Sequence, residues 1–128
     1  MRFLVKVTIP VEAGNALVRD PNFGKRLEGI TQDLKPEAVY FAIEGGQRTI
    51  YLIVNVADVS QTPAIAEPFW LSLSADVEFI PLMDTADMAK AAPAIARAAQ
   101  KYASGAGTGT ASRSQRRVRE TAGQSSRL

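Results

Sequence analysis

Five polar residues in alternating segments of the sequence have side chains suited to proton transfer or to binding a small organic molecule. They are Lys6, Tyr40, Tyr51, Asn55 and Glu78. Tyrosine hydroxyls can bind a carbonyl or phenolate oxygen, and a partly buried Glu78 with a raised pKa could serve as a general base. The same residues also suit a satisfied polar network at a dimer interface, with Lys6 and Glu78 as an ion pair, and we favour that interpretation.

Two further polar groups lie at predicted element boundaries. Glu12, with Asn15, stands where the first strand enters the first helix, so it is a candidate catalytic base. Stabilisation of the helix dipole is the favoured alternative for this acidic residue. Glu44 and Arg48 flank a predicted turn, and an exposed ion pair across that turn is favoured over an anion-binding role for Arg48.

Phe23, Phe69 and Trp70 are the main aromatic concentration on the predicted helices. Aromatic residues at helical spacing usually anchor a core, and we favour packing for these three. The alternative is that they line a pocket for an apolar or aromatic ligand, with Lys6 and Asn55 as polar ligand contacts.

The chain of 128 residues contains no His and no Cys. These absences exclude a Ser-His-Asp triad, a thiolate nucleophile, disulfides and metal sites built from His or Cys. We therefore expect no cofactor and no metal. If the protein is an enzyme, its chemistry is cofactor-free proton transfer of an isomerase or cyclase type, with Glu12 or Glu78 as the base and Tyr40 or Tyr51 as the hydrogen-bond donor.

Charge is unevenly distributed along the chain, whose net charge is +2. Residues 104–128 hold five Arg and one Glu, and only Val118 and Leu128 there are large and apolar. We expect this segment to be a flexible basic tail, because it cannot offset its own ordering entropy. Nucleic-acid contact through it would be weak, salt-dependent and independent of base sequence, so nucleic acid is not a favoured partner.

No segment of the sequence resembles a signal peptide or approaches the ~20 apolar residues that a membrane-spanning helix needs. The absence of Cys fits a reducing compartment. We therefore expect a cytoplasmic protein with no membrane partner.

Four segments alternate apolar and polar residues as strands do: 1–10, 38–44, 48–56 and 76–83. Gly45-Gly46 supplies the positive φ of a tight hairpin turn between the second and third. Each strand has one apolar face, which we expect beneath the helices as the core. The opposite faces mix apolar, tyrosine and charged residues, which favours a partner surface.

Helical patterns occupy residues 11–34, with a break at Pro21, and 60–73, where Ser60 or Thr62 provides the cap. A last helix runs from Asp84 to about Ala103, with Asp87 completing a capping box. We expect Pro68 and Pro93 to kink or divide their helices. The resulting order is a ferredoxin-like βαββαβ pattern in the α+β class, with a four-stranded antiparallel sheet and an extra C-terminal helix.

The stretches MRFLVKVTIPVEAGNA, KPEAVYF, GGQRT and VADVSQTPAIAEPFWLSLSADVEFIPLM resemble small bacterial proteins of the dimeric α+β barrel superfamily. Muconolactone isomerase is a distant member of that superfamily. The resemblance covers about residues 1–100 and implies two sheets packed face to face across a two-fold axis. It implies a homodimer, or a higher oligomer, but no catalytic residue.

Together these observations predict a dimeric α+β barrel domain over residues 1–103 and a tail over 104–128. The first hypothesis for function is binding of a small apolar or aromatic organic molecule between the sheet and the helices. The second is a non-enzymatic dimerisation or adaptor protein with an interacting basic tail. The third is weak, nonspecific nucleic-acid binding through the tail.

Overall fold

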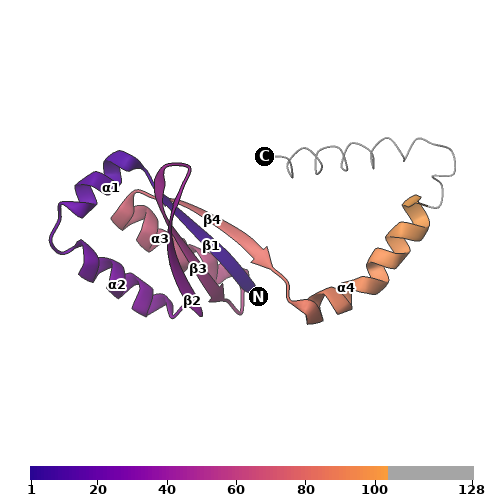
Figure 1. Ribbon diagram of the computed structural model, residues 1–128. Helices are drawn as coiled ribbons and strands as arrows, with labels where there is room; N and C mark the ends of the chain where they lie inside the picture. The colour runs from indigo at the N-terminus through magenta and orange to yellow at the C-terminus, as the bar shows by residue number, and fades with distance from the viewer. Residues whose placement is uncertain (104–128) are drawn as a thin grey trace. The chain divides into compact units, whose positions relative to one another are not determined.

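The computed structural model describes residues 1–103, so the predicted basic tail lies outside the described residues. The chain divides into two compact units, Met1–Met83 and a second that begins at Asp84 (Figure 1). The first unit contains the whole sheet. The second begins with helix α4, Thr85–Ala98, followed by the π-helical turn η2, Ala99–Ala103.

The sheet has four strands: β1 (Arg2–Ile9), β2 (Ala38–Glu44), β3 (Gln47–Asn55) and β4 (Asp76–Leu82). All neighbouring strands are antiparallel, and their order is β2-β3-β1-β4. The four predicted strands and their antiparallel arrangement are therefore confirmed. Strands β2 and β4 are the two edges of the sheet, and Pro81 lies in the edge strand β4, where a missing backbone N–H is tolerated.

Four helical elements of the first unit connect these strands: α1 (Val11–Val18), α2 (Phe23–Leu34), the short 3₁₀ helix η1 (Val59–Gln61) and α3 (Thr62–Leu73). The predicted break at Pro21 separates α1 from α2. The result is an α+β fold compatible with the ferredoxin-like pattern, although its first crossover carries two helices rather than one.

Helix α3 continues through Pro68, and α4 continues through Pro93. The prediction that these prolines divide their helices is therefore wrong, and the alternative, a kink at each proline, stays a prediction. A proline removes one backbone hydrogen bond, which is a limited loss when the residues beside it are anchored. In α3 that anchor is visible, since Ile65, Phe69 and Leu73 on either side of Pro68 are buried.

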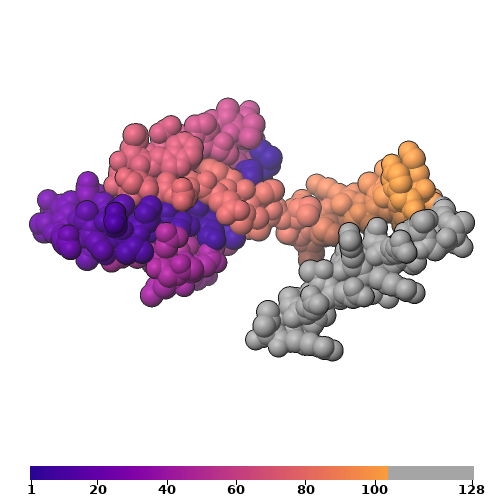
Figure 2. Space-filling model, turned by 90° about the horizontal axis from the view of Figure 1, so that it is seen from above, coloured from indigo at the N-terminus to yellow at the C-terminus, as the bar shows by residue number. Residues whose placement is uncertain are grey.

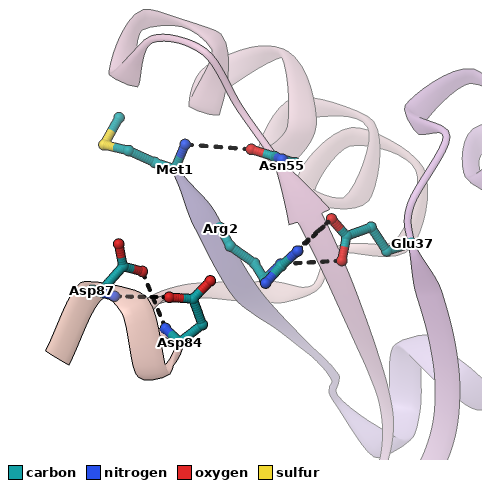
Figure 3. A network of polar contacts seen from close by, with 6 residues as sticks. All are labelled: Met1, Arg2, Glu37, Asn55, Asp84 and Asp87. Atoms are coloured by element: carbon teal, nitrogen blue, oxygen red, sulfur yellow. Dashed lines mark hydrogen bonds and ion pairs between the residues drawn. The ribbon is translucent and has the colours of Figure 1, made fainter. Parts of the chain in front are cut away.

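The predicted cap of the 60–73 helix is also wrong, because a 3₁₀ turn precedes it. Asp58 caps that turn by accepting a hydrogen bond from the Ser60 backbone N–H at 3.0 Å. Gln61 Oε1 in turn accepts from the Asp58 N–H at 3.3 Å. By contrast, the capping box of α4 is confirmed: Asp84 and Asp87 each accept from the other's backbone N–H, at 2.8 and 3.1 Å (Figure 3).

The core of the first unit lies between one face of the sheet and helices α1, α2 and α3. Figure 2 shows the outer surface of this unit in space-filling form, coloured from indigo to salmon along the chain. The buried apolar residues are Phe3, Val5, Val7, Ile9, Ile50, Leu52, Val54, Val56, Ile65, Phe69, Leu73 and Ala75. The expectation that strand faces pack beneath the helices is thus correct for β1 and β3.

Edge strand β2 departs from that expectation. Its residues Phe41 and Ile43 lie on the helix-facing side of the sheet, yet their exposed fractions are 67% and 84%. The helices therefore leave the outer part of β2 uncovered. An uncovered apolar strip of this kind is unfavourable in water unless something binds to it.

We call the other side of the sheet the open face, since α1, α2 and α3 all pack against the first side. It carries half-buried apolar residues, tyrosines and charged residues. Arg2 lies on it and reaches Glu37, with Nε 3.1 Å from Oε2 (Figure 3). Among the described residues, no helix is long and apolar enough to cross a membrane.

Candidate functional site

Four of the sequence-predicted site residues stand in one row across the open face. The strand register places Tyr40 opposite Tyr51, Tyr51 opposite Lys6, and Lys6 opposite Glu78. Side chains opposite each other in an antiparallel sheet have Cβ atoms about 4.5–5.5 Å apart. The fold therefore brings together residues that are 72 positions apart in the sequence, as 78 minus 6 gives.

Glu44 is the carboxylate that joins this row. Its Oε2 forms an ion pair with Lys6 Nζ, and its Oε1 accepts a hydrogen bond of 2.6 Å from the Tyr51 hydroxyl. The hydrogen bonds from Lys6 and Tyr51 hold the pKa of Glu44 below its usual range. In return, the hydrogen bond to Glu44 raises the pKa of Lys6 and that of Tyr51.

This arrangement corrects the expected Lys6–Glu78 ion pair. Glu78 is exposed on edge strand β4 and makes the smallest of the charge contributions that raise the pKa of Lys6, which pairs with Glu44 instead. The expected partial burial of Glu78 belongs to a dimer and stays a prediction, since Glu78 is exposed in the single chain. Lys6 pairs with Glu44 because the Glu44 carboxylate lies where it accepts from two donors at once. Glu78 has no hydrogen bond among the described residues.

The remaining polar candidates lie elsewhere. Asn55 pairs with Arg2 in the register, and its Oδ1 accepts a hydrogen bond of 3.3 Å from the Met1 amine (Figure 3). Glu12 is exposed on α1, which packs against the opposite side of the sheet from Tyr40, Tyr51 and Glu78. The structure therefore does not bring Glu12 together with the other candidate catalytic residues.

The three aromatic candidates differ in burial. Phe69 has no exposed surface and is part of the core, and Phe23 is half-buried against that core. Trp70, the next residue in α3, is 45% exposed. These residues do not form one aromatic pocket wall, because Phe69 and Trp70 are adjacent on a helix and so point in different directions.

An open groove of about 290 Å³ lies between α2 and β2. It is lined by Gly24, Leu27, Glu28, Thr31, Val39 and Phe41. Sequence reasoning missed this groove, although one signal was present. Gly24 interrupts the large side chains of α2, and a Cβ built at Gly24 meets no atom within 4 Å.

The polar groups of the groove are hydrogen-bond acceptors. The Thr31 hydroxyl donates to the Glu28 carbonyl oxygen at 2.9 Å, which leaves its own oxygen able to accept. The Glu28 carboxylate accepts one hydrogen bond, from Gln32 Nε2 at 3.3 Å, and has capacity for more. The groove thus combines an apolar surface from Leu27, Val39 and Phe41 with a polar edge that accepts hydrogen bonds.

Arg48 stands on the helix-facing side of β3, opposite Ile43 in the register. Its Nη2 donates to Asn15 Oδ1 at 3.2 Å, and its guanidinium covers Gly14 of α1. A Cβ at position 14 would lie 2.5 Å from Nη1, so glycine makes this close approach possible. The expected pair with Glu44 is wrong, because Glu44 and Arg48 lie on opposite sides of the sheet.

No group of three or more Asp, Glu, His or Cys side chains within residues 1–103 could hold a metal ion. No protein-family model matches the chain, and no curated protein compared with it matches either. Neither comparison supports the expected distant relationship to muconolactone isomerase.

Proposed function

We propose that the protein binds a small, largely apolar or aromatic organic molecule in the groove between α2 and β2. The observation that carries the proposal is the exposed Phe41 ring at the wall of a concave apolar surface. Ligand sites are typically concave and apolar, with a few polar groups that orient the ligand. This groove has that composition.

The size and polarity of the groove indicate how large the ligand is and which polar group it carries. Its volume of about 290 Å³ is just below the roughly 300–1,000 Å³ typical of ligand pockets, so a single ring or a short chain fits best. Glu28 and Thr31 favour a ligand whose polar end is a hydroxyl or an N–H. Proton transfer by Tyr40, Tyr51 or Glu78 stays a separate prediction, since those residues belong to the open face.

A pair of matched substitutions in α2 tests the proposal. Gly24 lines the groove and Gly29 does not, and a Cβ at either position meets no atom within 4 Å. Gly24→Leu therefore fills the groove, whereas Gly29→Leu makes the same chemical change outside it. Both variants are expected to fold, because glycine is the poorer helix former of the two residues.

Binding of p-cresol and indole to the full chain is measured by ¹⁵N–¹H NMR titration. We expect shifts confined to the amides of α2 and β2 in the wild type and in Gly29→Leu, and at least a tenfold weaker response in Gly24→Leu. The proposal is wrong if neither probe perturbs these amides, or if Gly24→Leu binds as well as the control.

A second proposal concerns assembly, and what supports it is the composition of the open face. Leu4, Ile53 and Ile80 are half-buried there, too apolar for an ordinary solvated surface, and the Tyr40 ring beside them is exposed. We propose that two copies pack through this face as a homodimer, which is the dimeric α+β barrel arrangement of a ferredoxin-like domain. In that case the face is an interface in which Glu44 satisfies Lys6 and Tyr51 within each copy, while Tyr40 and Glu78 are left to meet groups of the other copy.

Sedimentation velocity at micromolar concentration tests the dimer. Ile53→Glu places a charge in the centre of the open face, and Leu71→Glu makes a similar change at an exposed position of α3. We expect the wild type and Leu71→Glu to sediment as dimers, and Ile53→Glu as a folded monomer. A monomeric wild type contradicts this proposal and leaves the ligand-binding proposal standing.

A further inference from the structure

Arg48 is a half-buried cation with unused hydrogen-bonding capacity. Among the described residues its side chain donates one hydrogen bond, to Asn15, an uncharged side chain. Within residues 1–103, no carboxylate lies within ion-pair distance of its guanidinium. A guanidinium has five N–H donors, so most of the donors of Arg48 lack an acceptor in the part of the chain that the structure describes.

The Arg48 side chain packs against helix α1. Gly14 is buried, and the Arg48 side chain passes within 3.2–3.3 Å of the place a Cβ would occupy, at Cδ and Cζ. Glycine inside a helix costs roughly 0.5–1 kcal/mol relative to alanine. The glycine that allows the close contact between Arg48 and α1 therefore lowers the stability of that helix locally.

The guanidinium is adjacent to the apolar strip of β2. Ile43 is directly opposite Arg48, and Phe41 is its diagonal neighbour on the same side of the sheet, a relation that places residues about 7–8 Å apart, with their Cβ atoms somewhat closer. Phe41 lines the groove, and Ile43 extends the exposed apolar surface from the groove toward Arg48. A molecule lying on Phe41 and Ile43 thus has a cation within reach of one end.

We infer that the ligand of this groove is a monocarboxylate with an apolar body, whose carboxylate binds Arg48 while the body covers Phe41 and Ile43. This inference rests on the proposed ligand-binding function and names its ligand class. The charge pattern supports it, because Glu28 in the groove repels an anion and Arg48 at the β2–β3 hairpin end attracts one.

Arg48 supplies one positive charge, and its neighbour Asn15 is neutral. A ligand with a single negative charge therefore balances the charge at this position. A carboxylate accepts two parallel hydrogen bonds from the guanidinium fork, which combines charge and geometry. A phosphate dianion would retain a second charge without a protein cation at Arg48. The inferred ligand is therefore an aryl-alkanoic or short acyl carboxylic acid, with any hydroxyl placed at Glu28 and Thr31.

Two probes that share the same body and differ at one end group, a carboxylate or a primary alcohol, test this inference on the full chain. They are 4-(4-hydroxyphenyl)butanoate and the matching alcohol, 4-(4-hydroxyphenyl)butan-1-ol, and isothermal titration calorimetry measures their affinities. Arg48→Met removes the charge and keeps an apolar stem, and Arg48→Lys keeps the charge without the fork. Arg2→Met is the matched control, because Arg2 lies on the open face.

We expect the wild type and Arg2→Met to bind the acid about 10- to 100-fold more tightly than the alcohol, as charge-assisted hydrogen bonds do. Arg48→Met should lose this difference and keep its affinity for the alcohol, and Arg48→Lys should fall between. Equal binding of acid and alcohol by the wild type overturns the inference while the groove proposal stands. If p-cresol, acid and alcohol all fail to bind, both proposals fall.

Should Arg48→Met fail to fold, Arg48→Lys decides the question. A drop in acid affinity of several-fold with unchanged alcohol affinity supports the inference, since lysine cannot donate in the bidentate geometry. Equal losses for both probes contradict it.

Discussion

Lys6 and Tyr51 are directly opposite each other in the β1–β3 register, and both bind the same carboxylate, Glu44 on β2. One side chain thereby links three strands of the open face. Because Tyr51 donates its proton to Glu44, its hydroxyl is committed within the protein and is not a free donor toward a ligand. Lys6, Tyr51 and Glu44 therefore form a structural network within the chain.

This network predicts a dependence of stability on pH. The pKa of Glu44 is lowered from its ordinary 4.5, so its contribution is present above that value and is lost as pH falls through the folded-state pKa. The pKa values of Lys6 and Tyr51 are raised from 10.5 and 10.0, so their contributions are lost as pH rises through the folded-state values. Glu44→Gln should reduce the dependence of the unfolding free energy on pH at both the acidic and the alkaline end.

Urea unfolding between pH 2 and pH 11 measures this effect as the difference in unfolding free energy between wild type and Glu44→Gln. The control is Glu67→Gln, an exposed carboxylate of α3 without a hydrogen bond or ion pair in the part of the chain that the structure describes. A pH-independent difference for Glu44→Gln contradicts the assigned network.

The close approach of Arg48 to Gly14 predicts energetic coupling between them. Gly14→Ala should be neutral or destabilising by up to about 1 kcal/mol in the wild type, because the new methyl group displaces the guanidinium. In an Arg48→Ala background the same change should stabilise by roughly 0.5–1 kcal/mol, as alanine does in an unobstructed helix. Chemical denaturation of the four variants gives the coupling energy, and additive effects would refute the contact.

The hairpin between β2 and β3 depends on backbone conformations that favour glycine. Gly45 and Gly46 have φ values of 59° and 76°. Gly46→Ala should cost roughly 1–2 kcal/mol, the penalty of a left-handed conformation for a residue with a Cβ. Gly45→Asn should be milder, since asparagine tolerates this region. Thermal unfolding ranks the two variants, and Gly29→Ala, in an open helical position, should instead stabilise.

Phe69 and Trp70 should respond very differently to truncation although they are adjacent. Phe69→Ala leaves a cavity in the core and should cost about 3–5 kcal/mol of unfolding free energy. Trp70→Ala removes a half-exposed ring and should cost roughly 1 kcal/mol. Urea denaturation followed by circular dichroism compares them, which avoids dependence on the tryptophan signal. Similar losses in both variants would contradict the described burial.

Much of the fold could be read from local patterns. Alternation with period two marked all four strands, the Gly45-Gly46 pair marked the hairpin, and Pro21 marked the break between α1 and α2. These features depend on residues close together in the chain, so neighbouring side chains are sufficient to indicate them. The Asp84–Asp87 capping box is local for the same reason.

The candidate site was less accessible to the same reasoning. Phe41 is as apolar as Leu52, but Leu52 is central in the sheet and buried, while Phe41 is on an edge strand that the helices do not cover. The groove beside Phe41 depends on the distance between α2 and β2. The periodicity of the sequence gives no information about that distance. Glu28 and Thr31 were missed for this reason.

The sequence by itself determined which residues alternate, where the chain turns and which chemistries are absent, since these follow from residue type and short-range spacing. Only the tertiary structure decided that Lys6 pairs with Glu44 rather than Glu78, that Phe69 is buried and Trp70 exposed, and that Arg48 stands beside Ile43. Those outcomes depend on strand order and helix placement, which are set by packing between residues distant in the chain.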